Sequence, residues 1–512
     1  MMKNMTLQNI AACLDSPLYN GEGKEAFEIT GADLDSRKIE AGYLFFATRG
    51  ERVDGHSFIP QAAQKGTALV VCEKAPDVDI PYILVEDSFQ ALKQVASFYR
   101  QQLTIPVVGV TGSAGKTSTK EIIAAALSGK FCVLKTAGNY NNEVGVPLTI
   151  LRIRDEHEAA VVEMGINHFG EMERLTAIVR PDIAVITNIG QCHLENLGDR
   201  DGVLKAKTAI FQGLPENGRA VLNGDDDKLA TVSEVRGRKP VFFSRNAAAG
   251  NETAVSAEDR NKEAQAWNAG MPDDGLTTSS NLGIQPEVCL EKVLDSDLFG
   301  SRFVMNVFGE RVEAFVPLPG EHMVTNALAA AAVGHLLGLT AEEIVNGIAS
   351  VRAVDGRSHI IRKGDMTVID DCYNANPVSM KSAIDLLMSA KGRKTAILGD
   401  MFELGEEELA MHADVGAYAA QAGVDRLICI GQLSQAIYEG WEKAEGSDDQ
   451  IGAETVREGE KAGSLGKSGV FYFPDKESFF RSFVPADFAE NTVLAKASHG
   501  MEFQEIVDWI IE

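Results

Sequence analysis

Residues 109–119 are Gly109-Val110-Thr111-Gly112-Ser113-Ala114-Gly115-Lys116-Thr117-Ser118-Thr119, a segment that predicts a phosphate-binding loop. The run 105–110 before it is β-branched, as in a buried strand, and residues 120–127 after it are typical of a helix. Glycines allow the backbone to turn, so that successive N–H groups point toward a polyphosphate at the helix N-terminus. In such a loop Lys116 contacts the outer phosphates and the Thr117 hydroxyl binds Mg²⁺. The segment therefore predicts a nucleoside triphosphate site.

This loop has the short pattern Thr-Gly-x-x-Gly-Lys-Thr, because Val110 stands where the general P-loop pattern has a glycine. A tight turn with a helix cap is the alternative interpretation. The Lys116-Thr117 pair and the flanking strand and helix favour phosphate binding. The residues expected to contact the nucleotide are Thr111, Gly112, Ser113, Ala114, Gly115, Lys116, Thr117 and Ser118.

Chain length and local composition predict an α/β protein with three domains. The chain has 512 residues and 45% hydrophobic content, enough for roughly three domains with cores of their own. We expect a small N-terminal α/β domain at 1–103, a central doubly wound P-loop-type domain at 104–353 and a C-terminal Rossmann-like α/β domain at 354–512. Residues 246–281 have few large apolar side chains, so a solvated insertion is expected there.

Overall charge and cysteine usage limit the partners and the compartment. A net charge of −26 disfavours nucleic acid or an anionic membrane as the main partner. The seven cysteines contain no CxxC pair, and no apolar segment at the N-terminus resembles a signal peptide. No run approaches the roughly 18 apolar residues that cross a bilayer. We expect a cytoplasmic protein without membrane insertion, and a monomer by default.

Two further polar residues follow predicted strands and are candidate metal ligands. Glu163 comes at the end of the apolar run 159–162, and His193 follows the strand 183–189 across a short loop. Ligands of doubly wound sheets bind at the carboxyl edge of the strands. Ordinary hydrogen-bonding roles are the alternative for both residues, and the nearby phosphate loop favours Mg²⁺ binding.

Several long strings make the chain resemble the Mur ligases, the ATP-dependent amide-forming enzymes of peptidoglycan synthesis, over nearly its whole length. The strings are Thr136-Ala137-Gly138-Asn139-Tyr140-Asn141-Asn142-Glu143-Val144-Gly145-Val146-Pro147, Glu163-Met164-Gly165-Ile166-Asn167-His168, Asp370-Asp371-Cys372-Tyr373-Asn374-Ala375-Asn376-Pro377 and Leu398-Gly399-Asp400-Met401-Phe402-Glu403-Leu404-Gly405. They are similar to the family members that add D-alanyl-D-alanine. The loop pattern itself is shared with folylpolyglutamate synthases.

The resemblance implies a reaction in which ATP, UDP-N-acetylmuramoyl-tripeptide and D-Ala-D-Ala give the pentapeptide precursor, ADP and phosphate. The substrate carboxylate would first accept the γ-phosphoryl group and become an acyl phosphate, which the dipeptide amine attacks. It also implies two Mg²⁺ ions, one held by Thr117 and the other by Glu163, His193 and a carbamylated Lys207. Lys205 is the alternative lysine, and without the resemblance both would be ordinary solvated side chains.

The same resemblance assigns further contacts. It places Asn326 near adenine and Arg357 near the γ-phosphate, and it places Asp371, Tyr373 and Asn376 where the third domain closes over the nucleotide. For the last string an Asn-Pro turn is the alternative. Ser36, Arg37 and Asn142 are the expected contacts of the UDP-linked substrate, in the N-terminal domain and the loop that follows the phosphate site.

The chain departs from the family pattern at two places, and two other functions remain as alternatives. Gly320-Glu321-His322-Met323 replaces Gly-Arg-His-Asn, and Lys496-Ala497-Ser498-His499 replaces Lys-Gly-Ser-Arg near the expected dipeptide site. One alternative is a Mur-type ligase that adds a single amino acid. The other is a catalytically silent nucleotide-binding module, which we would expect to lack Lys116, Glu163, His193 or Lys207.

Overall fold

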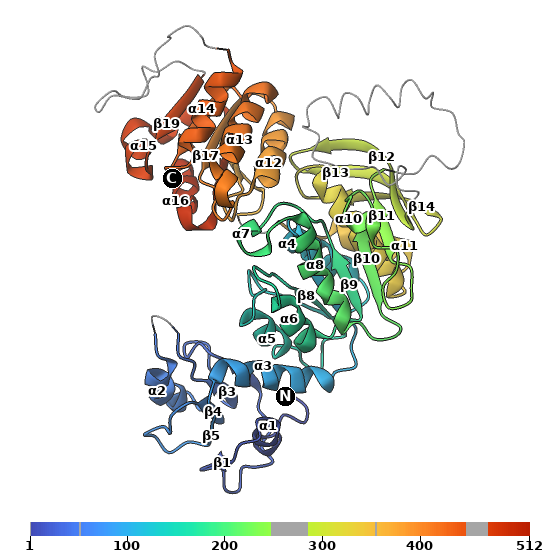
Figure 1. Ribbon diagram of the computed structural model, residues 1–512, viewed down its shortest axis with the longest axis vertical. Helices are drawn as coiled ribbons and strands as arrows, with labels where there is room; N and C mark the ends of the chain where they lie inside the picture. Colours follow the sequence, from blue (N-terminus) through green and yellow to red (C-terminus); the bar gives the residue numbers. More distant parts are fainter. Residues whose placement is uncertain (1, 51–52, 247–284, 354–355, 447–468) are drawn as a thin grey trace.

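The computed structural model describes residues 2–50, 53–246, 285–353, 356–446 and 469–512. It contains three β-sheets, each covered by helices, in three domains that follow one another along the long axis of the molecule (Figure 1). The predicted three-domain α/β class is confirmed. Apart from Asn246, the predicted insertion at 246–281 lies outside the described residues, and the boundaries at 103/104 and 353/354 stay predictions.

The N-terminal sheet has the order β1-β5-β4-β3-β2, with β1 antiparallel to β5 and the other pairs parallel. Its strands are β1 Leu18–Tyr19, β2 Gly31–Asp33, β3 Tyr43–Phe46, β4 Leu69–Cys72 and β5 Tyr82–Leu84. The helices are α1 Leu7–Cys13, the 3₁₀ turn η1 Gly55–Phe58, α2 Ile59–Gln64 and α3 Ser88–Gln101. The predicted strands at 43–47 and 68–71 correspond to β3 and β4.

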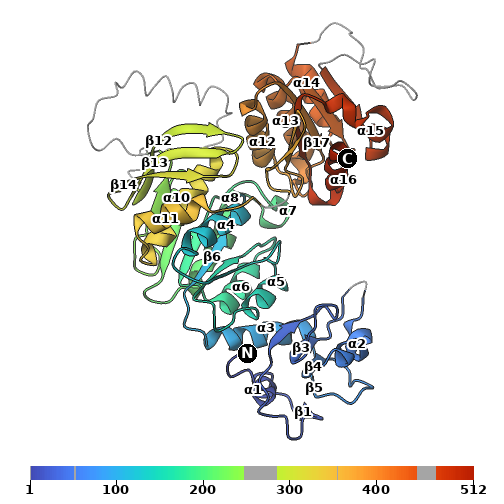
Figure 2. The ribbon, with the colours of Figure 1, turned by 180° about the vertical axis from the view of Figure 1, so that it is seen from behind.

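Helix α3 lies between the N-terminal and central domains in both views (Figures 1 and 2). The Tyr99 hydroxyl donates to the carbonyl of Ile153 at 2.7 Å, and the Arg100 guanidinium donates to the carbonyls of Val179 and Arg180 at 2.8 and 2.9 Å. Both side chains are buried. The last turn of α3 is therefore bonded to the central domain rather than to its own sheet.

The central sheet has nine strands in the order β14-β13-β12-β11-β10-β9-β6-β8-β7. Its strands are β6 Val107–Thr111, β7 Val133–Lys135, β8 Ala159–Glu163, β9 Ile183–Ile186, β10 Arg219–Asn223, β11 Val241–Ser244, β12 Val288–Asp297, β13 Gly300–Val307 and β14 Glu310–Val316. Its helices are α4 Lys116–Leu127, α5 Gly145–Ile150, α6 Glu171–Val179, α7 Leu194–Leu197, α8 Arg200–Thr208, α10 His322–Leu336 and α11 Ala341–Ala349, with 3₁₀ turns η2 Ala209–Gly213 and η3 Leu229–Thr231.

The pairing from β7 across to β12 is parallel, as the doubly wound pattern predicts, but β12, β13 and β14 are antiparallel. Phe308 and Gly309 form the two-residue connection between β13 and β14, with φ of 50° and 95°. Positive φ at both positions matches the right-handed twist of a hairpin. Because the first turn residue is Phe rather than Asn or Asp, the sequence gives no strong signal for this hairpin.

Strand β6 lies between β8 and β9, and this order places the phosphate loop beside Glu163. Val110 is paired with Glu163 on one side, and Thr111 with Ile186 on the other. The strands are parallel, so their carboxyl ends meet at one edge. Helix α4 begins there and packs against α10, which is apolar on all sides and buried.

The C-terminal sheet has the order β15-β16-β20-β17-β18-β19, parallel except for the edge strand β15. Its strands are β15 His359–Lys363, β16 Met366–Asp370, β17 Arg393–Gly399, β18 Arg426–Ile430, β19 Gly469–Phe473 and β20 Asn491–Lys496. Its helices are α12 Pro377–Ser389, α13 Glu408–Ala422, α14 Gln435–Ala444, α15 Lys476–Ser482 and α16 Gln504–Ile511, with 3₁₀ turns η4 Gly405–Glu407, η6 Pro485–Phe488 and η7 His499–Met501.

All seven cysteines are free thiols. Among the helices of the described ranges, none has both the length and the apolar character to cross a membrane.

Candidate active site

The phosphate loop joins β6 to α4 and has a backbone that only glycine adopts easily. Gly112 has a φ of 149°, and a Cβ there would lie 1.9 Å from the Thr187 hydroxyl oxygen. Gly115 has a φ of 76° and precedes the first residue of α4. The N–H groups of the first helical turn have no acceptor within the helix, so they present donors to an anion at this end.

Asn188 fixes the loop from the neighbouring strand end. Its side-chain oxygen accepts from the N–H groups of Ser113 and Ala114 at 3.1 and 2.8 Å. The Lys116 ammonium lies over the loop and donates to the carbonyl of Gly112 at 2.8 Å. The loop is thus held in shape by protein groups, with Lys116 at its centre.

Glu163 is almost fully buried, at 1% exposure, and several groups hold it. Its Oε1 accepts from the Thr117 hydroxyl at 3.2 Å and from the Asn141 amide at 2.8 Å. The Lys120 ammonium lies 3.7 Å from Oε2, and that oxygen has no hydrogen-bond donor among the described residues. The site therefore contains a buried carboxylate oxygen with capacity for another ligand.

Lys116, Lys207 and His193 lie close enough to influence one another electrostatically. Burial, together with the nearby Lys116 cation, lowers the pKa of Lys207 to about 8. Burial also lowers the pKa of Lys116, an effect that the negative charge of Glu163 opposes. The pKa of His193 is lowered by burial, while Glu403 opposes that shift. The cluster is thus rich in cationic groups and suited to anions.

His193 contacts the third domain. It has a φ of 52° just before α7, and its Nδ1 lies 2.9 Å from Oε2 of Glu403. Glu403 comes from the loop after β17 and also has a positive φ, of 63°. In this structure His193 therefore pairs across the domain interface, while Glu163 bonds within the central domain.

The predicted adenine and γ-phosphate contacts lie near the loop. A Cβ on Gly115 would lie 3.3 Å from the side-chain oxygen of Asn326, which is buried in α10. The Arg357 guanidinium lies 3.8 Å above the Tyr373 ring. A small cleft beside the start of α4 is lined by Thr117, Ser118, Glu121, Leu318, Met323, Arg352 and Arg357. Two guanidinium groups therefore border the phosphate end of the loop.

The other predicted residues of the third domain have protein partners. Asp371 accepts from the N–H of Ser358 at 2.8 Å and pairs with the buried Lys496 at 2.5 Å. Asn376 caps α12 by accepting from the N–H of Ser379 at 2.8 Å. Their direct role toward a nucleotide stays a prediction.

The predicted substrate contacts lie in the N-terminal domain and in the loop before α5. The Ser36 hydroxyl donates to the Gln61 side chain at 2.9 Å, and Arg37 forms a bidentate pair with Asp35 while 84% of its side chain is exposed. Asn142 accepts from the N–H groups of Val144 and Gly145 and so caps α5. Their substrate contacts also stay predictions.

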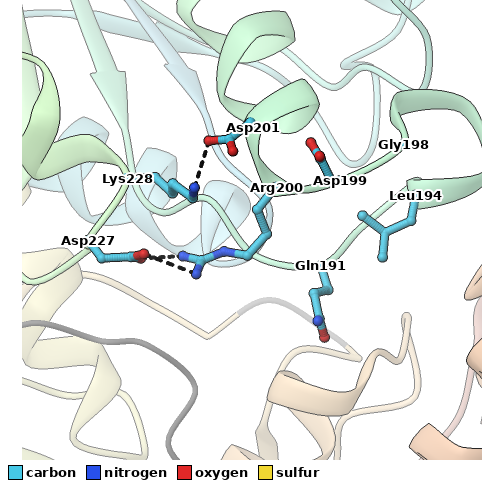
Figure 3. A pocket seen from close by; sticks show the side chains of 8 residues that line it. All are labelled: Gln191, Leu194, Gly198, Asp199, Arg200, Asp201, Asp227 and Lys228. Carbon is cyan, nitrogen blue, oxygen red and sulfur yellow. Dashed lines mark hydrogen bonds and ion pairs between the residues drawn. The ribbon is translucent and has the colours of Figure 1, made fainter.

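A larger cavity of about 430 Å³ lies beside the loop that carries His193 (Figure 3). Its lining residues are Gln191, Leu194, Gly198, Asp199, Arg200, Asp201, Asp227 and Lys228. The charges in it are paired, Arg200 with Asp227 and Lys228 with Asp201. No phosphate-loop residue lines this cavity.

Four contributors to the site are absent from the predicted set: Lys120, Asn141, Asn188 and Glu403. Asn141 and Glu403 lie within strings quoted for the family resemblance, so the signal was present. Lys120 is one turn after Lys116 on α4 and resembles a solvated helix residue in sequence. It is 1% exposed because it pairs with Glu121 as well as approaching Glu163.

The fold and the site define a three-domain α/β protein of the P-loop nucleotide-binding class. Family models described as "Mur ligase family, catalytic domain", "Mur ligase middle domain" and "Mur ligase, glutamate ligase domain" match residues 28–129, 110–334 and 356–499.

Individual relatives match over nearly the full length. The UDP-N-acetylmuramoyl-tripeptide–D-alanyl-D-alanine ligase of Bacillus subtilis is 34% identical, covering 100% of this chain and 99% of the relative. The solved UDP-N-acetylmuramoylalanyl-D-glutamyl-2,6-diaminopimelate–D-alanyl-D-alanyl ligase of Acinetobacter baumannii has a TM-score of 0.76 at 28% identity, covering 99% and 98%. The MurF ligase of Thermotoga maritima in complex with ADP has a TM-score of 0.72 at 26% identity, covering 94% and 97%. The chain belongs to the Mur ligase family.

Proposed function

We propose that this protein is an ATP-dependent ligase that joins D-alanyl-D-alanine to UDP-N-acetylmuramoyl-tripeptide and releases ADP and phosphate. The observation that carries the proposal is the match to the Bacillus subtilis enzyme of that name along the whole of both chains. The tripeptide of the Acinetobacter baumannii relative is alanyl-D-glutamyl-2,6-diaminopimelate, and we extend its glutamyl middle residue to the substrate of this chain.

The phosphate loop and its cations fit the first half-reaction. The terminal carboxylate of the tripeptide attacks the γ-phosphorus of ATP, the bond to the β-phosphate oxygen breaks, and ADP leaves. Lys116 and the N–H groups at the start of α4 stabilise the charge on the transferring group. The amine of D-Ala-D-Ala then attacks the acyl phosphate, losing a proton and displacing phosphate to form the amide. Arg357 and Arg352 border this end.

The donor atoms present fit Mg²⁺. Oxygen ligands suit this ion, and Thr117, Glu163 and the phosphates of a bound nucleotide supply them. The second oxygen of Glu163 is buried and free of hydrogen-bond donors among the described residues. No group of three or more His, Cys, Asp and Glu side chains in the described ranges suits a metal, so a second ion needs another anionic ligand beside Glu163 and His193. Bound Mg²⁺ would neutralise phosphate charge.

A carbamylated Lys207 would supply that ligand. Lys207 is 1% exposed and its pKa is lowered to about 8, so a fraction of the amine is neutral near neutral pH. The neutral amine is the form that adds CO₂, and the product is an anion with two oxygen donors. An anion there would also be attracted to the neighbouring Lys116 cation.

The proposal also assigns a ligand to each of the remaining predicted site residues. Ser36, Arg37 and Asn142 contact the UDP-linked substrate, Asn326 lies near adenine, and Asp371, Tyr373 and Asn376 lie where the third domain meets the nucleotide. We take the enzyme to be cytoplasmic and monomeric.

A coupled assay for phosphate release tests the function. We expect release with ATP, Mg²⁺, UDP-N-acetylmuramoyl-tripeptide and D-Ala-D-Ala together, and background release when any one is omitted. Mass spectrometry of the product should show the tripeptide extended by two alanyl residues. Activity with free single amino acids in place of the dipeptide would favour another Mur-type ligase, and ATP binding without turnover would favour the silent module.

A further inference from the structure

Lys38, Tyr140 and Arg152 form a cluster at the junction of the N-terminal and central domains, which we call the junction cluster. The Lys38 ammonium donates to the Tyr140 hydroxyl at 2.8 Å. The Arg152 guanidinium lies 5.1 Å from the centre of the Tyr140 ring. Lys38 follows β2 in the N-terminal domain, and the other two flank α5 in the central domain. Two cations from different domains therefore meet at one tyrosine.

The charges of the junction cluster are not balanced. Among the described residues, the carboxylate that pairs with it is Asp33, whose Oδ2 lies 3.6 Å from Arg152. Asp33 is only 5% exposed, and its Oδ1 already accepts from the N–H groups of Leu34 and Asp35 at 2.9 and 3.0 Å. Lys38 is exposed and Arg152 half-buried. In a chain of net charge −26, this excess of positive charge favours an anionic ligand.

The junction cluster is rigidly connected to the reaction centre. Asn141, the residue after Tyr140, donates to Glu163 at 2.8 Å. On the other side, a Cβ on Gly145 would lie 2.4 Å from the Tyr140 backbone, so the loop packs closely on the start of α5. Consecutive Cα atoms are about 3.8 Å apart. An anion at the junction cluster would therefore lie close to the carboxylate that is activated beside Glu163.

We propose that the junction cluster binds the free carboxylate of the glutamyl residue in the nucleotide-linked peptide, an inference that rests on the proposed function. A glutamyl residue has two carboxyl groups, and its link to the next residue uses one of them. The other stays ionised and lies one residue before the terminal carboxylate that reacts. A guanidinium and an ammonium on either side of it form charge-assisted hydrogen bonds. Lys38 and Arg152 are then specificity-determining residues for the peptide.

The diphosphate of the substrate is the other anion that could meet two cations. It is separated from the reacting carboxylate by the sugar and the rest of the peptide, whereas Tyr140 is next in sequence to a residue that bonds Glu163. The location of the junction cluster therefore favours the peptide carboxylate, and the binding experiment separates the two anions.

The experiment measures Kd by calorimetry for three ligands: UDP-N-acetylmuramoyl-tripeptide, the same compound with the free glutamyl carboxylate converted to its amide, and UDP-N-acetylmuramic acid without peptide. The proteins are the wild type, Lys38→Gln, Arg152→Gln and the matched control Lys93→Gln. Lys93 is a cation of α3 that pairs with Glu143 of the central domain at 2.9 Å.

We expect Arg152→Gln to weaken tripeptide binding by about tenfold or more, with a smaller loss for Lys38→Gln. The wild type should bind the amidated tripeptide more weakly than the unmodified tripeptide by a similar factor. Arg152→Gln should bind the two tripeptides with equal affinity. Binding of UDP-N-acetylmuramic acid should stay within about twofold in every protein, and Lys93→Gln should bind all three ligands as the wild type does. Arg152→Lys should recover part of the loss and separates charge from folding defects, which thermal melting also reports.

Equal weakening of all three ligands by Arg152→Gln would overturn the proposal and assign the junction cluster to the diphosphate or the sugar. Unchanged tripeptide affinity in both variants would also overturn it and leave the cluster as a contact between domains. Either result is distinct from failure of the proposed function, which would appear as absence of phosphate release in the wild type.

Discussion

Two carboxylates at the candidate active site, Glu163 and Glu403, differ in how they are held. Glu163 lies inside the central domain, is 1% exposed, and receives hydrogen bonds from Thr117 and Asn141 beside the Lys120 cation. Glu403 belongs to the third domain, has a side chain that is 60% exposed, and contacts His193. One half of the site is therefore fixed by the fold of a single domain, and the other half depends on how two domains meet.

This difference indicates which groups of the site are already in position before substrates bind. Groups held within one domain are preorganised and need no rearrangement during the reaction. The His193–Glu403 contact can break when the third domain moves, at small cost, because an exposed ion pair contributes at most about 1 kcal/mol. The surroundings of Glu163 and the phosphate loop therefore depend on the central domain alone, whereas those of His193 depend also on the position of the third domain.

The largest effect is expected at Lys116, which belongs to the fixed half. Lys116→Ala should lower kcat by about 10³-fold, because it removes the cation nearest the loop carbonyls and the transferring phosphoryl group. Steady-state phosphate release measures this, and thermal melting checks that the variant folds. Turnover close to that of the wild type would contradict the proposed role of the loop.

Glu163→Gln should damage both activity and stability. The substitution keeps the shape but leaves the buried Lys120 ammonium with a weaker partner, so we expect a loss of about 3 kcal/mol in the free energy of unfolding. Activity should fall about 100-fold. Urea denaturation measures the stability. A variant as stable as the wild type would show that Glu121 and the carbonyl of Thr136 satisfy Lys120 without Glu163.

Lys207→Met should change stability in a pH-dependent way in buffer free of CO₂. The folded-state pKa of about 8 lies below the ordinary lysine value of 10.5, so burial of the charged amine destabilises the fold at and below pH 8. Above pH 8 the folded state loses this proton before the unfolded state does, and the stability of the wild type rises relative to the variant. At pH 7 we expect the free energy of unfolding of Lys207→Met to exceed that of the wild type by about 3 kcal/mol. This difference should decrease between pH 8 and 10.5.

Urea denaturation at several pH values measures the difference between wild type and Lys207→Met. A difference in the free energy of unfolding that does not vary with pH would show that burial does not lower the pKa of Lys207. Repeating the series with bicarbonate should stabilise the wild type alone if the amine becomes carbamylated.

Glu403→Gln should have the smallest effect. The free energy of unfolding should fall by less than about 1 kcal/mol, because the side chain is largely exposed. The pKa of His193 should decrease, because Glu403 opposes the downward shift that burial causes. NMR titration of the His193 ring measures that pKa, with Glu406→Gln as the matched control. A stability loss as large as that of Glu163→Gln would remove the contrast between the two halves.

The sequence predicts those site residues whose positions are set by a strand end or a glycine turn. The phosphate loop, Glu163 and the strands around them follow from local patterns, and parallel pairing brings them to one edge. Lys120 could not be found in this way, since its burial depends on Glu163, which is distant in sequence. Glu403 lies within a string quoted for the family resemblance, but its contact with His193 was not predicted because the two residues belong to different domains.

Other features escaped prediction for local reasons. The hairpin of β13 and β14 turns at Phe308 and Gly309, a pair without the usual Asn-Gly signal. Asn376 differs, because the two expected roles were a nucleotide contact and an Asn-Pro turn, and its capping of α12 was not predicted. A short polar residue before a proline suits each of these roles, and the sequence does not distinguish them.

Helix α3 has a consequence for dissecting this protein into fragments. Tyr99 and Arg100 donate hydrogen bonds to carbonyls of the central domain. A cut after residue 103 would therefore separate these two side chains from the domain that they bind. A truncated protein beginning near residue 86 would retain them, and one beginning at 104 would expose apolar surface to water. Helix α3 nevertheless packs on both domains, so a cut at either of its ends divides a shared hydrophobic core.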